Sequence, residues 1–311
     1  MPELPEVETT VNQLKKKVLG RAFIDAWTDS PKIIRLRQGF GKQVKKPPFE
    51  QFKREIKGKK IQKVWRRGKN IIFDLSEQKA LLIHQKLTGH LLVGNWKLES
   101  NPSGSPPEGV QGNWKPLKTG PLRERINTYI HLMFRLDKNL MLALSDLRKF
   151  AKVELWNKDE LEDSKEFRSL GPEPLEENFT FEKFKEILKN KKGKIKQVLM
   201  DQEIIAGIGN IYSDEILWEA KIHPFKEIKR LSDEEIKRIY GAMQKILKKA
   251  VKLGGESISD YRDIEGKKGG FDILRKVYRR EGEKCPRCGV IIKRIKIGGR
   301  SAHFCSKCQK I

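Results

Sequence analysis

The sequence predicts an α+β fold in which a helix leads into a β-sandwich and a helical region then ends in a cysteine-bearing β-hairpin. Three observations carry this prediction. From residue 21 to about residue 156, apolar residues recur with a period near two, which is typical of strands. After residue 180 the spacing changes to three and four, which is typical of helices. All four cysteines lie in a β-prone stretch at the end of the chain.

The first half of the chain is expected to hold one helix and several strands. Leu4, Val7, Val11, Leu14 and Val18 recur at helical spacing over residues 2–19, and Gly20 ends the pattern. The expected strands are 22–28, 59–64, 70–75, 80–84, 90–93, 128–136, 140–145 and 152–156. Residues 101–120 are rich in proline, glycine and serine and are expected to form a surface insertion in a loop.

The second half is expected to be helical. Residues 157–180 are predicted to be a linker, and helices follow at 182–189, 194–201 and 211–220. Ser232 and Glu235 predict a capping box at the start of a longer helix, which Gly254 and Gly255 end. We therefore expect a domain at 1–156, a linker at 157–180, a helical domain at 181–272 and a separate cysteine-bearing module at 273–311.

The charge of the chain predicts a polyanionic partner. The chain has 311 residues and a formal net charge of +25, with lysine and arginine spread along its whole length. Such a field attracts nucleic acid, and an anionic membrane surface or a generally lysine-rich proteome is the alternative explanation. No secretory signal begins the chain, and no apolar run approaches the ~20 residues of a membrane span. We expect no membrane association.

The cysteines form two Cys-x-x-Cys pairs, which predict one structural zinc ion. Cys285 and Cys288 make the first pair, and Cys305 and Cys308 make the second. Two such knuckles on a hairpin supply four thiolates for a tetrahedral ion and leave no position open for water. Two disulfides or a redox pair are the alternatives. The cysteine-free remainder of the chain and the glycine after the first knuckle favour zinc.

Six ordered motifs resemble one family of enzymes over nearly the whole chain. They are MPELPE at 1–6, RRGK at 66–69, DLRKF at 146–150, LGPEPL at 170–175, the segment LMDQ to GIGNIY at 199–212, and the cysteine knuckles with Gly299-Arg300. Together they resemble the formamidopyrimidine-DNA glycosylases, bacterial enzymes that remove oxidised purines. The resemblance implies an N-terminal catalytic β-sandwich domain, a helix–two-turn–helix DNA-binding domain with a lesion-capping loop at 259–271, and a zinc finger.

The resemblance also implies a bifunctional glycosylase and AP lyase that acts through the amine of Pro2 once Met1 is removed. An α-amino group titrates near ~8, well below the ~10.4 of lysine, so more of it is neutral and able to form a Schiff base. Glu3 is implied as the acid that protonates the sugar, with Glu6 in support. Lys69 is implied to assist β-elimination and Arg300 δ-elimination. Without the resemblance, Glu3 reads as a helix-terminal glutamate and Lys69 and Arg300 as surface residues.

The remaining implied residues contact DNA. Leu87, Arg148 and Phe150 would fill the gap left when the damaged nucleotide is flipped out of the stack. Leu87 stands where the family usually has methionine. Asn127 stands where we place the family's DNA-contacting histidine, and Lys194 and Asn210 are expected to contact phosphate, Asn210 at a helix N-terminus with free N–H groups. Without the resemblance, Leu87 and Phe150 would be core residues and Arg148 would form a salt bridge at a strand end. Asn210 would be a simple helix cap.

The expected partner is double-stranded DNA that contains a damaged base. We expect a monomer that needs no nucleotide cofactor and that lies in a bacterial cytoplasm, associated with the nucleoid through DNA. Two other functions are the main alternatives to this prediction, and a metal-dependent nuclease is a distant third. One is an oxidised-pyrimidine glycosylase of the endonuclease VIII type, which the leucine at position 4 disfavours. The other is a non-catalytic, zinc-containing DNA-binding protein, which does not explain Pro2, Glu3 and Lys69 together.

Overall fold

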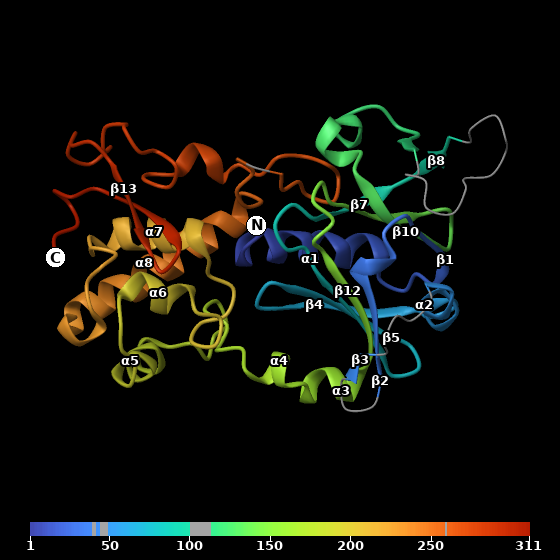
Figure 1. Cartoon of the computed structure of the whole chain (residues 1–311), viewed down its shortest axis with the longest axis horizontal. Coiled ribbons are helices and arrows are strands. Elements are labelled where there is room, and N and C mark those ends of the chain that lie inside the picture. The colour runs from blue at the N-terminus through green and yellow to red at the C-terminus, as the bar shows by residue number, and fades with distance from the viewer. Residues whose placement is uncertain (39–41, 44–48, 100–112, 259) are drawn as a thin grey trace. The chain divides into compact units, whose positions relative to one another are not determined.

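The computed structural model describes residues 1–38, 42–43, 49–99, 113–258 and 260–311, and the chain forms two compact units (Figure 1). Unit 1 contains Met1–Pro2, Glu6–Arg168 and Gly254–Gly269. Unit 2 contains Glu3–Pro5, Ser169–Leu253 and Gly270–Ile311. Each unit therefore includes a piece of chain that is distant in sequence from its main body.

Unit 1 is a sandwich of two sheets that share one hydrophobic core. The first sheet has the order β1-β10-β11-β7 and the second has the order β3-β2-β12-β6-β5-β4. Only the β2–β12 pair is parallel among these neighbours. The helix α1 (Leu4–Val18) buries its apolar side chains in the same core as both sheets. The strands are β1 (Phe23–Thr28), β2 (Ile34–Gln38), β3 (Lys42–Gln43), β4 (Ile61–Arg67), β5 (Asn70–Leu75), β6 (Lys79–His84), β7 (His90–Gly94), β10 (Ile130–Leu136), β11 (Met141–Ser145) and β12 (Lys152–Asn157).

The expected helix and all eight expected strands of the first half are present, but the sequence analysis missed several short elements. The helix α2 (Phe49–Ile56) and the hairpin strands β8 (Trp96–Leu98) and β9 (Trp114–Pro116) were not expected. Neither was β2, although its sequence IRLRQ alternates apolar and polar residues. The expected linker contains the helices α3 (Lys158–Asp163) and α4 (Lys165–Arg168). Most of the expected surface insertion at 101–120, namely residues 101–112, lies outside the described residues.

The glycine-rich segment expected to cap the lesion packs into unit 1 rather than into the helical domain. Ile264 is buried in the sandwich core, and its carbonyl accepts a hydrogen bond from the backbone N–H of Val93 at 2.8 Å. Gln13 of α1 donates to Asp263 at 3.0 Å and accepts from the backbone N–H of Ile264 at 3.2 Å. These contacts hold the described part of the segment against α1 and β7. Ser259 lies outside the described residues.

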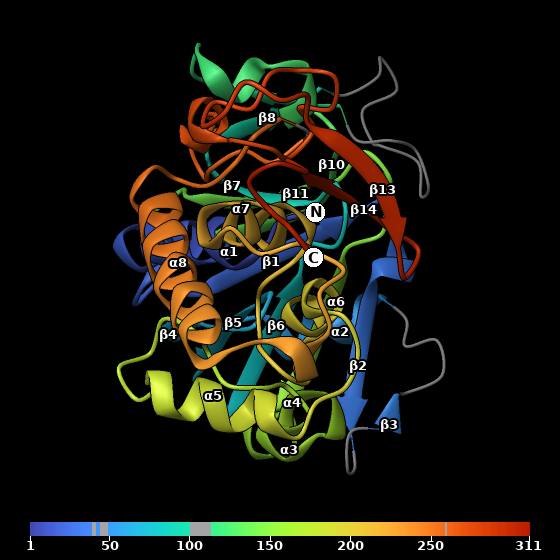
Figure 2. The ribbon, with the colours of Figure 1, turned by 90° about the vertical axis from the view of Figure 1, so that its left-hand side faces the viewer.

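Unit 2 contains four main helices and a C-terminal hairpin. The helices are α5 (Phe181–Lys189), α6 (Ile195–Met200), α7 (Asn210–Ala220) and α8 (Asp233–Lys252), and they share a second hydrophobic core. The hairpin strands β13 (Lys293–Ile297) and β14 (Arg300–Phe304) lie side by side, coloured red in Figure 2. The predicted capping box is confirmed, because Ser232 and Glu235 each bond the other's backbone N–H. Among the described residues, no helix is long and apolar enough to cross a bilayer.

We expect the substitution Ser232→Ala to destabilise the protein by about 1 kcal/mol, because it removes the acceptor for the N–H of Glu235 at the start of α8. The measurement is urea denaturation followed by circular dichroism. The control is Ser232→Thr, whose hydroxyl preserves the cap. An unchanged free energy of unfolding in the alanine variant would contradict the prediction.

Candidate active site

The carboxylate of Glu3 is bound by the N-terminus of α7. Glu3 Oε2 accepts a hydrogen bond from the backbone N–H of Gly209 at 2.7 Å, and Oε1 accepts one from Ile211 at 2.9 Å. Tyr212 N–H lies 3.4 Å from Oε2. The first N–H groups of a helix have no partner within the helix, so a carboxylate placed there satisfies several of them at once. Glu3 is 2 % exposed, and its position is therefore set by α7 rather than by solvent.

Two glycines make this contact possible. A Cβ atom on Gly209 would lie only 2.5 Å from Cδ of Glu3, so any side chain here would displace the carboxylate. Gly207 has a φ of +91°, and its Cβ would lie 2.7 Å from Cβ of Leu4. The backbone N–H of Leu4 donates to the carbonyl of Gly207 at 3.0 Å. The GIGN motif thus lets the backbone approach residues 3 and 4 closely.

This arrangement corrects one expectation about Asn210. The N-terminus of α7 was predicted to offer free N–H groups to DNA phosphate, but the structure gives three of its neighbouring N–H groups to Glu3. An internal carboxylate occupies the position that an external anion would take. Asn210 is the first residue of α7, and its side-chain oxygen is buried without a hydrogen-bond partner. Pro2 itself is buried and directly precedes the fixed Glu3.

Glu6 is fixed within unit 1 by the segment that follows α8. Its Oε1 accepts a hydrogen bond from the backbone N–H of Glu256 at 2.8 Å. Gly255 has a φ of +80°, and a Cβ there would lie 2.6 Å from the same oxygen. The hydroxyl of Tyr261 donates to the backbone carbonyl of Glu6 at 3.1 Å, and burial raises the pKa of this phenol. Glu6 therefore joins α1 to the segment 254–269, in keeping with a supporting role.

Two loops of unit 1 are tied together through Asp146, which the sequence analysis did not single out. Its Oδ2 accepts hydrogen bonds from the backbone N–H groups of Phe150 and Ala151, both at 2.7 Å. Its Oδ1 accepts from the hydroxyl of Thr88, which lies in the loop between β6 and β7. Thr88 Oγ1 in turn accepts from the backbone N–H of Arg148 at 3.1 Å. Aspartate at the first position of a turn commonly accepts hydrogen bonds from the backbone N–H groups that follow. The aspartate of the DLRKF motif was therefore a signal for this role.

This tie brings together the three residues expected to enter the DNA stack. Leu87 lies at the tip of one loop, and Arg148 and Phe150 lie in the other. Phe150 is 49 % exposed, which excludes the core-phenylalanine alternative. The guanidinium carbon of Arg148 lies 4.7 Å from the centre of the Phe150 ring, so the two side chains stack on each other. An exposed aromatic ring held on a rigid turn is suited to insertion between bases.

Lys69 is not an ordinary surface lysine. It lies in the two-residue turn between β4 and β5, after Gly68 with its φ of +57°, and it is only 7 % exposed. His84 is a neighbour that the sequence analysis missed: burial, together with the charges of Lys86 and Lys69, lowers its pKa to about 3. His84 Nδ1 accepts from the backbone N–H of Lys86 at 3.0 Å, so the neutral ring carries its proton on Nε2.

Asn127 is placed differently from its predicted role. It is 1 % exposed, and its amide donates to the carbonyls of Pro121 at 2.8 Å and Gly266 at 3.1 Å. Its oxygen lies 2.8 Å from Nε2 of His90, whose pKa burial lowers to about 4. Both amide hydrogens are therefore used inside unit 1, and the side chain has no donor left for a phosphate. Asn127 instead joins β7 to the segment 254–269.

His131 on β10 is a second histidine that the sequence analysis missed. Its Nδ1 lies 2.9 Å from Oδ1 of Asp29, which fixes the orientation of the ring. Asp29 also pairs with Lys149 of the DLRKF loop at 3.6 Å. This chain of contacts places His131 beside the loop that carries Arg148 and Phe150.

The four cysteines converge on one point, as a zinc site requires. Their Sγ atoms all lie within 4.8 Å of one another, and none forms a disulfide. A tetrahedral ion with Zn–S bonds of about 2.3 Å separates its sulfurs by about 3.8 Å, which this cluster matches. Burial and the neighbouring thiols raise the pKa of Cys308. Four thiolates this close repel one another, and a cation between them removes that repulsion. The cysteines form a structural zinc site.

Two buried acids of α7 attach the zinc-bearing hairpin to the helical core. Asp214 Oδ2 accepts from the backbone N–H of His303 at 3.0 Å and lies 2.9 Å from its Nδ1, while Oδ1 pairs with Lys196 of α6. Glu215 accepts from three consecutive backbone N–H groups, at 276–278, over 2.8–3.0 Å. Burial raises the pKa of Glu215. Neither acid stands out in the sequence, because both resemble ordinary charged residues of a helix.

The two remaining predicted cations lie in unit 2. Arg300 is exposed and follows the turn Gly298-Gly299, whose φ angles of +52° and +74° suit a two-residue hairpin turn. Lys194 precedes α6, and its Nζ lies 4.3 Å from the centre of the Phe225 ring. Arg300 is therefore presented to solvent, whereas Lys194 rests partly on an aromatic ring.

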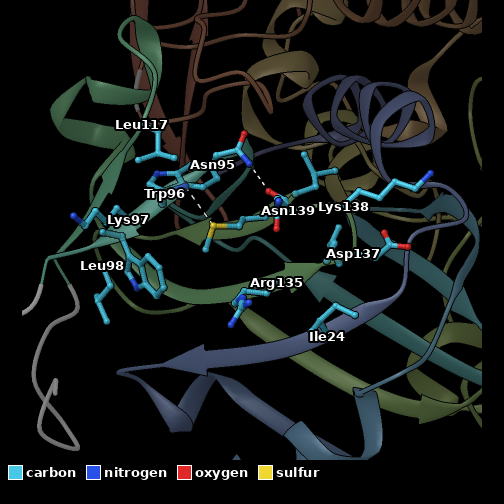
Figure 3. A pocket seen from close by; sticks show the side chains of 14 residues that line it. Ile24, Asn95, Trp96, Lys97, Leu98, Leu117, Arg135, Asp137, Lys138 and Asn139 are labelled. Atoms are coloured by element: carbon cyan, nitrogen blue, oxygen red, sulfur yellow. Dashed lines mark hydrogen bonds between the residues drawn. The ribbon is translucent and has the colours of Figure 1, made fainter. Parts of the chain in front are cut away.

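A separate cavity of about 780 Å³ lies on unit 1 (Figure 3). It is lined by side chains such as Trp96, Arg135 and Asn139, from β8, β10 and the turn after β10. None of the residues predicted for catalysis, DNA contact or zinc binding lines it. The size of a cavity is thus no guide to the candidate chemistry in this protein.

Three parts of the chain match known protein families. Residues 1–153 match the N-terminal domain of formamidopyrimidine-DNA glycosylase, and residues 170–262 match the H2TH domain of the same enzyme. Residues 282–311 match the zinc finger found in FPG and IleRS. The matched regions together include every residue that the sequence analysis proposed for catalysis, DNA contact or zinc binding.

Full-length relatives and solved structures agree with these matches. The chain is 37% identical over 311 residues to a formamidopyrimidine-DNA glycosylase of Pelotomaculum thermopropionicum, and 36% identical over 310 residues to one of Listeria innocua, with 100% of each chain covered. A solved complex of Lactococcus lactis Fpg with DNA containing an abasic site has a TM-score of 0.79 and 35% identity. A complex of the same protein with DNA containing Fapy-dG has the same values. Both cover 99% of this chain and 100% of the solved one.

We expect Gly209→Ala to destabilise the protein by about 1–3 kcal/mol, because the new methyl group would overlap the Glu3 carboxyl group. Urea denaturation measures the change. The matched control is Gly241→Ala in α8, where a Cβ meets nothing within 4 Å and the helix gains a better helix former. Equal stabilities of the two variants would show that Glu3 is not packed against Gly209.

Removal of zinc is expected to lower the melting temperature, because the four thiolates repel one another without a cation and the hairpin loses its anchor. The measurement is thermal unfolding before and after treatment with a chelator, alongside elemental analysis for one zinc ion per chain. Cys308→Ser should show the low melting temperature without chelator. A metal-free protein of unchanged stability would contradict the structural role.

Proposed function

The chain belongs to the formamidopyrimidine-DNA glycosylase family of DNA repair enzymes, and we propose that it excises oxidised purines from duplex DNA through a Schiff base on Pro2. The substrates proposed are 8-oxoguanine and formamidopyrimidines, and the strand is then cleaved by β,δ-elimination. The observation that carries the proposal is the binding of the Glu3 carboxylate by the N-terminus of α7, which fixes the residue that follows the nucleophile.

The first step joins the enzyme to the sugar. The neutral amine of Pro2 attacks C1′, the glycosidic bond breaks, and the purine leaves with the proton that the amine gives up. Glu3 donates a proton to O4′, which opens the sugar ring and leaves an iminium ion between Pro2 and C1′. This step needs an acid held close to the amine, and Glu3 is both adjacent in sequence and immobilised by Gly209 and Ile211.

The second step cleaves the strand. Loss of a proton from C2′ of the iminium ion expels the 3′ phosphate, and loss of a proton from C4′ then expels the 5′ phosphate. We assign Lys69 to the first elimination and Arg300 to the second. The low exposure of Lys69 supports its assignment to the first elimination, because a buried cation interacts more strongly with a phosphate than a solvated cation does. The exposure of Arg300 leaves its guanidinium free to meet a phosphate.

The DNA must present its damaged base outside the stack. We propose that Leu87, Arg148 and Phe150 fill the gap, with the Arg148 guanidinium stacked on the inserted ring. The Thr88–Asp146 contact supports this assignment because it makes one rigid unit of the two loops. Lys194 and Asn210 remain proposed phosphate contacts through their side chains, whereas Asn127 is assigned to internal packing. We propose that the enzyme acts as a monomer, without a nucleotide cofactor, on DNA in the bacterial nucleoid.

The test of this proposal is borohydride trapping on a duplex that contains 8-oxoguanine opposite cytosine. We expect the protein with Met1 removed to form a covalent adduct and Pro2→Gly to lose it, because the secondary amine supplies the bond to C1′. The matched control is Pro5→Ala, which alters the second proline of the MPELPE motif and should still form the adduct. Gel electrophoresis under denaturing conditions measures the adduct.

Two results would contradict the proposal in different ways. Faster trapping on thymine glycol than on 8-oxoguanine would favour an oxidised-pyrimidine glycosylase of the endonuclease VIII type. No adduct on any of several oxidised bases, from protein shown to lack Met1, would favour a non-catalytic DNA-binding protein with a structural zinc ion.

A further inference from the structure

A cavity of about 380 Å³ in unit 1 is lined mainly by cations. Five of its eight lining residues are lysine or arginine: Lys32, Arg35, Lys86, Lys149 and Lys152. Phe150, the exposed ring of the DLRKF loop, lines the same cavity. We name these five cations and the hollow between them the basic pocket.

The strand order explains why these charges gather. β12 lies between β2 and β6, so Lys152 stands opposite His84 at the end of β6, and Glu154 stands opposite Arg35 on β2. Lys86 follows two residues after His84, at the start of the loop that leads to Leu87. Lys32 comes from the turn before β2, and Lys149 comes from the loop before β12.

The carboxylates nearby neutralise only part of this charge. Glu154 pairs with Arg35 at 4.0 Å and with Lys152 at 3.0 Å, and Glu166 also pairs with Lys152 at 3.0 Å. Asp29 pairs with Lys149 at 3.6 Å. Among the residues that the structure describes, Lys32 and Lys86 form no ion pair. Burial and the charges of Lys152 and Arg35 lower the pKa of Lys86, and the carboxylates of Glu154 and Glu166 offset this only in part.

We propose that the basic pocket binds a backbone phosphate of the DNA, next to the point where Phe150 enters the stack, and that Lys86 is its central contact. The inference rests on the proposed function and adds a site to it. A phosphate would neutralise the positive charge that Glu154, Glu166 and Asp29 leave uncompensated, and several lysines around one phosphate give a strong, sequence-independent contact. Because Phe150 lines the same cavity, occupation of the pocket also sets the depth at which the ring is held.

The backbone at Lys86 allows a clean test. Its φ is +57°, a region that favours glycine, so Lys86→Gly removes the charge without straining the loop. Lys138, in the turn between β10 and β11, has a φ of +52° and does not line the pocket, so Lys138→Gly is the matched control. Lys86→Arg preserves the charge and serves as the rescue variant.

The experiment measures the affinity of each variant for a duplex with a stable abasic-site analogue at several salt concentrations. For Lys86→Gly we expect the slope of log K against log [salt] to become shallower by about one, since one phosphate contact contributes about 0.9. Affinity at low salt should fall by about tenfold, with unchanged thermal stability. Lys138→Gly and Lys86→Arg should keep the slope of the parent protein.

The outcomes separate this inference from the proposed function. Equal slopes for Lys86→Gly and Lys138→Gly, while the parent protein still traps on 8-oxoguanine, would overturn the phosphate site alone. Failure of the parent protein to trap would overturn the proposed chemistry, and the salt slopes would still decide whether the basic pocket contacts DNA.

Discussion

The contact on which the candidate active site depends is the one between the Glu3 carboxylate and the N-terminus of α7. It joins residues that are more than 200 positions apart and is made by backbone N–H groups, which cannot rotate away as side chains do. Glu3, the proton donor that we propose, is thereby held by groups whose positions do not depend on side-chain rotation. Gly207 and Gly209 leave no room for a side chain, because residues 3 and 4 pack directly against their backbone. The glycines of the GIGN motif are therefore explained by this close contact rather than by flexibility.

The same helix organises the rest of unit 2. Its first turn binds Glu3, its middle carries Asp214 and Glu215, and its last turn supports the zinc site through Trp218, which shares a core with Cys285 and Cys305. Burying a carboxylate destabilises a fold unless its oxygens accept hydrogen bonds. Asp214 and Glu215 each accept several hydrogen bonds. A single helix of 11 residues therefore positions the N-terminal residues, the helical core and the zinc-bearing hairpin.

The sequence was sufficient for the fold because periodicity and cysteine spacing are local signals. The helix α1, the capping box at Ser232 and the zinc cysteines are all read from residues within a few positions of one another. The missed features depend on partners distant in sequence. Asp146 organises a loop through Thr88, Asn127 turns inward because Gly266 lies beside it, and the helix N-terminus predicted to hold phosphate is taken by Glu3. No pattern of residue types reveals which of two anions will occupy one set of N–H groups.

The burial of Pro2 has a consequence for how the protein is made. In the proposed mechanism the amine of Pro2 is freed by removal of Met1, and in the folded chain Pro2 is buried and Glu3 is bound by the N–H groups of residues 209–212. The ribosome makes those residues about 200 positions later, and at about 5–20 residues per second the delay is roughly 10–40 s. During that interval residue 3 has no helix to bind, and the N-terminus is accessible to the enzyme that removes Met1. The removal of Met1 that our proposal requires therefore has this interval, set by the length of chain between Pro2 and the helix that binds Glu3.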